Sequence, residues 1–214
     1  MIKGVVFDMD GVISETELMH HNAWHHAAGA QPPSHEEWAK SYMGRGIFEI
    51  ANDLIEKYSI NITPQELVKK KTEKMHGLIL ESELKHYPGV KELLAYLNKE
   101  KIPIAIASSS SREEINAILE KLGIKEYFKT IVSGLEVENP KPAPDVYLKA
   151  AEELGIKPSE GIAIEDSPTG IKSAKAAGLY TIAVTHTNEK ENLNQADRIV
   201  SNLSEIKGIV EELE

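Results

Sequence analysis

Short apolar segments that alternate with helical segments constrain the fold of this chain more than any other feature. The predicted buried strands are residues 4–7, 102–110, 129–134 and 161–167, followed by two more in "YTIAVTH" and "DRIVSN". Strands that alternate with helices of about 10–15 residues are typical of βαβ units and a parallel sheet. Because the strands are apolar almost throughout, we expect helices to cover both faces of the sheet. The sequence therefore predicts an α/β fold with a doubly wound parallel sheet.

One interval breaks this alternation. Residues 15–83 show helical patterns only, and this length is too great for a single crossover between strands. We expect an inserted all-helical cap domain here, and the sequence "HYPGV" marks the return of the chain to the core. The predicted α/β core domain consists of residues 1–14 and 84–214, and the predicted cap domain of residues 15–83.

The composition limits the possible partners and location. A formal net charge of −10 disfavours nucleic acid as a partner, and no apolar run approaches the roughly 20 residues of a membrane span. The N-terminus lacks a basic region followed by a small-residue cleavage site, and the chain contains no cysteine, which excludes disulfides and thiolate metal sites. We expect a cytoplasmic monomer that acts on a small ligand.

Two carboxylates follow the first strand directly. Asp8 and Asp10 come immediately after the apolar run of Val5, Val6 and Phe7. Two acids at the end of a buried strand repel each other and lose hydration, so the pair needs compensation. Either a cation binds between them, or one of them takes part in chemistry.

Polar residues also follow the other predicted strands. Ser108 follows the second strand, Lys141 lies in a proline-rich loop after the third, and Glu165 and Asp166 follow "GIAI". Ligands of open parallel sheets bind beyond the carboxyl ends of the strands, so we expect all these residues to face one crevice. Each acid on its own is more simply read as a helix or turn cap. Four strand ends that carry polar residues at one edge favour a functional site.

This set of residues indicates phosphoryl transfer. Carboxylate oxygens are suitable ligands for Mg²⁺, and the metal and Lys141 would offset charge on the transferring group. The Ser108 hydroxyl and nearby amides would hold its oxygens. One carboxylate can attack phosphorus, and the second can protonate the leaving group and later activate water.

Four segments resemble, in order, the motifs of the haloacid dehalogenase (HAD) superfamily. They are "DMDGV" from Asp8, "SSS" from Ser108, "KPAPD" from Lys141 and "EDSPTGIKSAKAAG" from Glu165. The resemblance covers the whole chain, including the helical insertion after the first motif. It implies a Rossmann-like core, with Asp8 as nucleophile and Asp10 as general acid and base. True dehalogenases lack the second aspartate, so Asp10 argues against dehalogenation.

The same resemblance implies the ligand contacts of the site. It implies Mg²⁺ bound by Asp8, the Asp10 carbonyl and Asp166, with Glu165 adjacent. It implies phosphate bound by Ser108, Ser109 and Lys141. These residues are our predicted metal-binding and phosphate-binding residues.

Within the superfamily the chain is most similar to the β-phosphoglucomutase-like and sugar-phosphate phosphatase branch. The segment "SETELMHHNAW" matches the linker into the cap of that branch, with Thr16, His20 and Trp24 at matching places. Mutases of the branch carry an arginine three residues after a cap glycine, where this chain has Ile47. Its arginine is Arg45, directly after the glycine. We therefore predict a Mg²⁺-dependent phosphatase of small phosphorylated metabolites, most simply sugar phosphates, with a phosphomutase as the runner-up.

Several cap and core residues allow two interpretations. Arg45 and Lys71 are candidate substrate contacts, but Arg45 could be an exposed loop residue and "KKKTEK", which contains Lys71, could be a solvated helix face. Arg112 could reach the site or cap its own helix. His21 and His25 have the i, i+4 spacing of metal ligands, but no third ligand is evident, so we expect solvated side chains.

Two functions of other classes compete with the phosphatase. A phosphoacceptor signalling module also places acids and a lysine around Mg²⁺ on a doubly wound sheet, but it has no helical cap of this size. A catalytically silent metabolite-binding protein is the other alternative, and intact acids in all four motifs disfavour it.

Overall fold

Six parallel strands form one sheet in the computed structural model, which describes residues 1–31, 33–42 and 45–213. The strands are β1 (Gly4–Phe7), β2 (Ile104–Ser108), β3 (Thr130–Ser133), β4 (Gly161–Glu165), β5 (Tyr180–Val184) and β6 (Arg198–Val200). Their order is β3-β2-β1-β4-β5-β6, and every neighbouring pair is parallel. The order reverses between β1 and β4, which is the arrangement of a doubly wound sheet. The predicted fold class is confirmed.

Nine α-helices occur in the described ranges of the chain. They are α1 (Glu17–Ala28), α2 (His35–Tyr42), α3 (Ile47–Tyr58), α4 (Pro64–Glu81), α5 (Val90–Lys99), α6 (Arg112–Leu122), α7 (Asp145–Leu154), α8 (Pro168–Ala177) and α9 (Ile206–Leu213). No helix among these is both long enough and apolar enough to cross a membrane.

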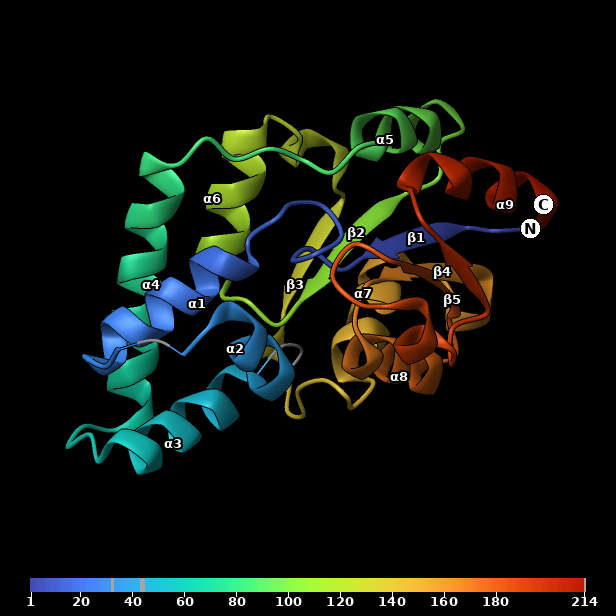
Figure 1. The fold of residues 1–214 in the computed structure, drawn as a ribbon. Coiled ribbons are helices and arrows are strands. Elements are labelled where there is room, and N and C mark those ends of the chain that lie inside the picture. Colours follow the sequence, from blue (N-terminus) through green and yellow to red (C-terminus); the bar gives the residue numbers. More distant parts are fainter. Residues whose placement is uncertain (32, 43–44, 214) are drawn as a thin grey trace.

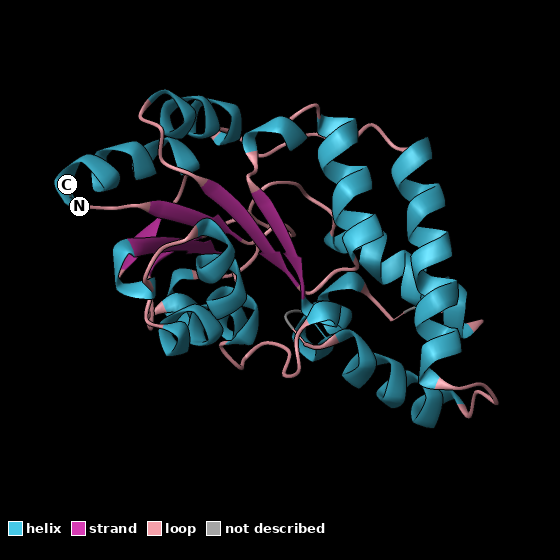
Figure 2. Ribbon diagram, turned by 180° about the vertical axis from the view of Figure 1, so that it is seen from behind, coloured by secondary structure: helices cyan, strands magenta, loops and turns pink. Residues whose placement is uncertain are grey.

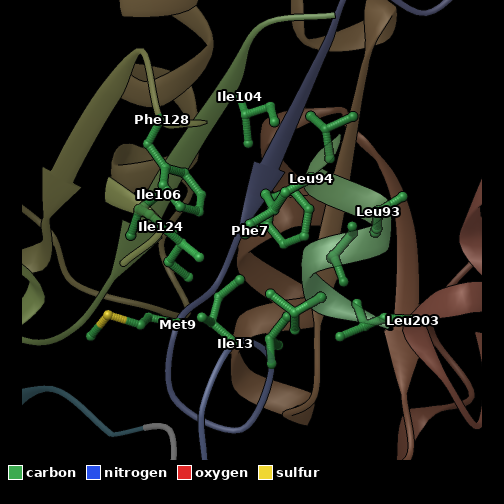
Figure 3. Packing of buried hydrophobic residues seen from close by; sticks show 14 of the residues in the cluster. Phe7, Met9, Ile13, Leu93, Leu94, Ile104, Ile106, Ile124, Phe128 and Leu203 are labelled. Carbon is green, nitrogen blue, oxygen red and sulfur yellow. The ribbon is translucent and has the colours of Figure 1, made fainter. Parts of the chain in front are cut away.

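Side-chain alternation along the strands divides the core between the two faces of the sheet. In β1, Val5 and Phe7 belong to the cluster that packs against α5, α6 and α9, whereas Val6 belongs to the cluster on α7 and α8. Figure 3 shows Phe7 beside Leu93 and Leu94 of α5. Both faces are therefore covered, as the apolar strands predict.

Helices α1 to α4 gather beyond one end of the sheet, on the left in Figure 1. They share a hydrophobic cluster that includes Trp24, Trp38, Tyr42 and Leu54. These four helices lie inside residues 15–83, and the division of the chain at residues 14 and 84 stays a prediction.

The two segments that connect these helices to the sheet lie side by side. The Ser14 hydroxyl donates to the carbonyl of Lys85 at 2.9 Å, and the Tyr87 amide donates to the carbonyl of Ile13 at 2.9 Å. Ser14 also forms an isolated antiparallel bridge with His86. Both connections thus pass through one small region next to the end of β1.

The carboxyl ends of the strands face helices α1 to α4. In Figure 2 the arrows of the sheet run toward this helical group. The reversal of strand order between β1 and β4 creates the crevice where open α/β sheets bind ligands. Residues that directly follow β1 and β4 are consequently the first candidates for a site.

Candidate active site

Asp8 and Asp10 project from the turn that follows β1. The Asp8 amide donates to the carbonyl of Ile164 at 2.9 Å, so the ladder with β4 continues through Asp8. Gly11 has a φ of +78°, and a Cβ added there would lie 2.0 Å from Oδ2 of Asp166. Only glycine allows this turn and its close approach to the loop after β4.

Lys141 connects the loop after β3 to both central strands. Its Nζ lies 2.6 Å from Oδ1 of Asp8 and 2.6 Å from Oε1 of Glu165. Burial alone would lower the pKa of Lys141, but the charges of Asp8 and Glu165 outweigh it and raise the pKa. The lysine therefore carries a permanent positive charge beside the Asp8 carboxylate.

Glu165 uses both of its carboxylate oxygens within the protein. Its Oε1 accepts from Lys141 and from the Tyr147 hydroxyl at 2.7 Å. Its Oε2 accepts from the amides of Asp166 and Ser167, at 3.1 and 3.2 Å, and from the Ser167 hydroxyl at 3.1 Å. Glu165 is thus placed to hold Lys141 and the loop after β4 in position.

Three buried carboxylates form a possible metal site. Asp8, Glu165 and Asp166 each offer one oxygen, and these oxygens lie within 4.8 Å of one another. Burial and the neighbouring carboxylates raise the pKa values of Asp8 and Asp166. At Asp8 the charge of Lys141 opposes this rise only in part. A divalent cation would relieve this repulsion, and an all-oxygen donor set fits Mg²⁺. Since the oxygens of Glu165 already have partners, Asp8 and Asp166 are the better direct ligands.

Asp10 lies in a different environment from Asp8. Its Oδ1 accepts from the Thr16 hydroxyl and contacts Nε2 of His20 at 3.0 Å, and its Oδ2 accepts from the hydroxyls of Ser110 at 3.0 Å and Ser108 at 3.4 Å. Burial alone would raise the pKa of Asp10, but His20 and the hydrogen bond from Thr16 lower it. Asp10 is therefore a carboxylate with a possible proton partner, His20, at hydrogen-bonding distance.

A pocket opens between these residues and helices α1 to α4. On the side of the sheet it is lined by Asp8, Asp10, Ser109, Ser110, Lys141, Asp166 and Ser167. On the opposite side it is lined by Glu17, His20, Trp24, Trp38, Tyr42, Arg45, Ile47, Ile50 and Lys71. Carboxylates, a lysine and an apolar, partly aromatic wall thus meet in one cavity.

The family follows from comparison with known proteins. A family model described as "Haloacid dehalogenase-like hydrolase" matches residues 5–184. The chain belongs to the haloacid dehalogenase-like hydrolases.

Three relatives show which haloacid dehalogenase-like hydrolases are similar. The chain is 31% identical to fructose-1-phosphate phosphatase YqaB of Escherichia coli, over 85% of this chain and 95% of that protein. It is 32% identical to β-phosphoglucomutase of Bacillus subtilis, over 96% and 92% of the two chains. The solved structure of CbbY from Rhodobacter sphaeroides in complex with xylulose-(1,5)bisphosphate superposes with a TM-score of 0.89, at 27% identity and 96% coverage of both chains. Relatives of this hydrolase therefore include a sugar-phosphate phosphatase and a phosphomutase.

The structure brings the predicted core residues of this hydrolase together. Asp8, Asp10, Ser108, Ser109, Lys141, Glu165 and Asp166 all lie at the pocket or in contact with residues that line it. Of the predicted cap residues, Thr16 and His20 contact Asp10.

The other two predicted cap residues are already paired with acids. Lys71 is buried, and its Nζ lies 2.8 and 3.1 Å from the two oxygens of Glu114 in α6, so the solvated-face interpretation is wrong for Lys71. Arg45 lines the pocket but pairs with Glu49 and Asp53 of α3. Gly44, the cap glycine that directly precedes Arg45 in the sequence, lies outside the described residues.

Two further interpretations are resolved by the structure. Arg112 pairs with Glu136 at 2.6 Å on the surface and does not line the pocket. His21 and His25 are buried, so the expectation of solvated side chains is wrong. They pack against Trp38, at ring-centroid distances of 5.4 and 5.0 Å, because α1 turns that face toward α2.

Sequence reasoning missed five residues at or near the site. They are Glu17, Ser110, Glu114, Tyr147 and Thr187, whose hydroxyl donates to Asp166. Thr187 follows β5, so the rule about strand ends could have found it. Ser110 stands in the quoted "SSS", and Glu17 in the quoted linker. Nothing in the sequence singled out Glu114, because its partner Lys71 is 43 residues away.

Proposed function

We propose that this hydrolase is a Mg²⁺-dependent phosphatase that hydrolyses small phosphorylated metabolites, chiefly sugar phosphates, through an aspartyl-phosphate on Asp8. One observation carries the proposal. Two aspartates two residues apart occupy opposite environments: Asp8 touches Lys141 and the carboxylate cluster, and Asp10 touches His20 and the pocket serines. This separation suits one acid for nucleophilic attack and the other for proton transfer.

The residues divide the reaction between them. An Asp8 oxygen attacks phosphorus, the bond from phosphorus to the ester oxygen breaks, and Asp10 passes to the leaving oxygen a proton that His20, in contact with it, supplies. Asp10 then takes a proton from water as the water oxygen attacks phosphorus, which releases phosphate and restores Asp8. Lys141 and the hydroxyls of the β2–α6 loop offset the charge on the phosphoryl oxygens. When bound, Mg²⁺ at Asp8 and Asp166 supplies further positive charge there.

The cap, the location and the assembly belong to the same proposal. We propose that residues 15–83 close over the sheet edge, which excludes bulk water, and move on the linkers near Ser14–Thr16 and Glu83–Pro88. The hydrogen bonds between these linkers support a shared pivot. We further propose a cytoplasmic monomer with no nucleic-acid or membrane partner.

A phosphomutase is the runner-up. The β-phosphoglucomutase relative favours it, whereas Ile47 presents an apolar side chain to the pocket where a mutase would hold its distal phosphate. A phosphoacceptor module is disfavoured by the helices that cover the sheet edge and by the enzymatic relatives.

Phosphate release tests the proposal. With Mg²⁺, the protein should hydrolyse p-nitrophenyl phosphate and several members of a panel of phosphorylated sugars and small acids. Conversion of β-glucose 1-phosphate to glucose 6-phosphate faster than phosphate release would establish the mutase instead. Absence of all turnover, with the protein folded, would favour a binding or signalling role.

A further inference from the structure

The cations that line the pocket determine which charges a substrate can carry. In the described part of the chain they are His20, Arg45, Lys71 and Lys141. Lys141 and His20 are engaged with the reacting acids Asp8 and Asp10. Arg45 and Lys71 are therefore the cations available to the part of the substrate that leaves.

Lys71 of α4 is neutralised by Glu114, a buried residue of α6. The side chains of Lys71 and Glu114 are 2% and 0% exposed, and the shorter of their two contacts is 2.8 Å. Glu114 is fixed at the start of α6, where its carboxylate also accepts from the Ser111 amide at 3.3 Å. Separating two buried charges leaves each without compensation, which is strongly unfavourable. A substrate anion would have to break this buried ion pair before it could bind Lys71, so Lys71 is not available to it.

Arg45 is shared between two carboxylates. Its Nη1 lies 2.7 Å from Asp53, and its Nη2 lies 2.7 Å from Glu49, which also accepts from Nε at 2.8 Å. One guanidinium against two acids leaves a net negative charge. The guanidinium carbon also lies 5.5 Å from the centre of the Tyr42 ring, which fixes its orientation.

Among the described residues, the rest of this wall adds no cation except His20, which contacts Asp10. Trp24, Trp38, Ile47 and Ile50 are apolar, and Glu17 is the acid among them. The Oε1 atom of Glu17 is buried and has no hydrogen-bond partner among the described residues. A buried polar atom without a partner is costly, so it favours a ligand that brings a hydroxyl group.

We propose, building on the phosphatase function above, that the pocket selects phosphate monoesters of uncharged, hydroxyl-bearing alcohols and disfavours a second phosphate, with Glu114, Glu49 and Asp53 as the specificity-determining residues. Within the described part of the wall formed by α1 to α4, a second anionic group on the substrate meets only cations that already have acidic partners. A hydroxylated leaving group meets Glu17 and apolar ring faces instead. The substrate of this hydrolase then differs from the xylulose-(1,5)bisphosphate in the CbbY structure.

Competition experiments test this selectivity in the wild-type protein. Fructose 1-phosphate, fructose 6-phosphate and fructose 1,6-bisphosphate are compared as inhibitors of p-nitrophenyl phosphate hydrolysis with saturating Mg²⁺. The better monophosphate should bind at least about tenfold more tightly than the bisphosphate, or about 1.4 kcal/mol. Equal or tighter binding of the bisphosphate would overturn the proposal, and so would no inhibition by any of the three. If the wild-type protein did not hydrolyse p-nitrophenyl phosphate at all, that result would instead refute the proposed phosphatase function.

Charge-removing variants then test the three acids. The double variant Glu49→Gln with Asp53→Asn changes two solvent-accessible side chains and leaves Arg45 without an acidic partner. Glu114→Gln does the same for Lys71. Each should raise the affinity for the bisphosphate relative to the monophosphates by about tenfold. The control is Glu56→Gln with Glu73→Gln, which removes two exposed acids of α3 and α4 that pair with neither Arg45 nor Lys71. An unchanged ratio in the folded Glu49/Asp53 variant would contradict the role of these acids, even if Glu114→Gln fails to fold.

Discussion

The Nζ atom of Lys141 lies 2.6 Å from Oδ1 of Asp8, so the loop after β3 supplies the counter-charge for the carboxylate that ends β1. In the proposed mechanism, this contact places Lys141 as the protein's own cation at the reacting phosphorus. Lys141→Met should lower kcat/KM for p-nitrophenyl phosphate by about 100-fold or more, the usual cost of one stabilising group at a transition state. Lys172→Met, at an exposed position of α8, is the matched control and should retain full activity. Equal activity of both variants would contradict the assignment of Lys141.

Gly170 leaves room for the carboxylate that positions Lys141. A Cβ added to Gly170 would lie 1.7 Å from Oε1 of Glu165, whereas one added to Gly208 in α9 meets nothing within 4 Å. An exchange of glycine for alanine inside a helix usually stabilises by about 1 kcal/mol. We expect this gain for Gly208→Ala, but a loss of about 1–3 kcal/mol for Gly170→Ala, because the overpacked site must shift. Urea unfolding measures both, and a stabilised Gly170→Ala would refute the close packing around Glu165.

Removal of the metal should affect stability as well as activity. Asp8 and Asp166 have raised pKa values because burial and neighbouring carboxylates disfavour their charged forms. EDTA should abolish turnover, Mg²⁺ should restore it, and saturating Mg²⁺ should raise Tm because the ion binds only the folded state. Asp166→Asn should lose most of this Tm shift. A wild-type Tm that does not respond to Mg²⁺, with turnover unaffected by EDTA, would show that these carboxylates serve another purpose.

Two buried histidines should make the protein sensitive to acid. Burial, His21 and Lys57 lower the pKa of His25 from 6.5 to about 4, and burial and His35 lower the pKa of His21. None of the four ring nitrogens meets the geometry of a hydrogen bond with a described residue. The unfolded chain binds these protons more readily than the folded chain does. The free energy of unfolding is therefore highest above the unfolded pKa of 6.5 and declines as the pH falls toward 4.

Removal of one of these imidazoles should flatten this pH dependence. Between about pH 7 and pH 5 the wild type should lose about 1 kcal/mol more unfolding free energy than His25→Gln does. The control His26→Gln changes an exposed histidine of the same helix and should follow the wild type. Urea midpoints at each pH provide the comparison. The same slope in all three proteins would mean that His25 is not protonated on unfolding.

The sequence predicts the strand ends well because a parallel sheet allows them few alternatives. Once β1 and β4 are recognised as buried strands, Asp8 and Asp166 must emerge at the same edge. The solvated-face interpretation of Lys71 failed for a different reason. Its helix carries charged residues on several sides, and only the packing of α4 against α6 shows which of them meets Glu114. The expectation of solvated side chains for His21 and His25 failed in the same way, because α2 and α3 bury these histidines.

A burst experiment with the Asp10→Asn variant tests the central claim most directly. p-Nitrophenol is a good leaving group, so phosphorylation of Asp8 needs little help from an acid, whereas hydrolysis of the aspartyl-phosphate needs Asp10 as a base. With p-nitrophenyl phosphate and Mg²⁺, the variant should release about one p-nitrophenol per active site rapidly and then nearly stop. The double variant with Asp8→Asn should show no burst. Steady turnover by Asp10→Asn at the wild-type rate, or an equal burst without Asp8, would contradict an aspartyl-phosphate mechanism.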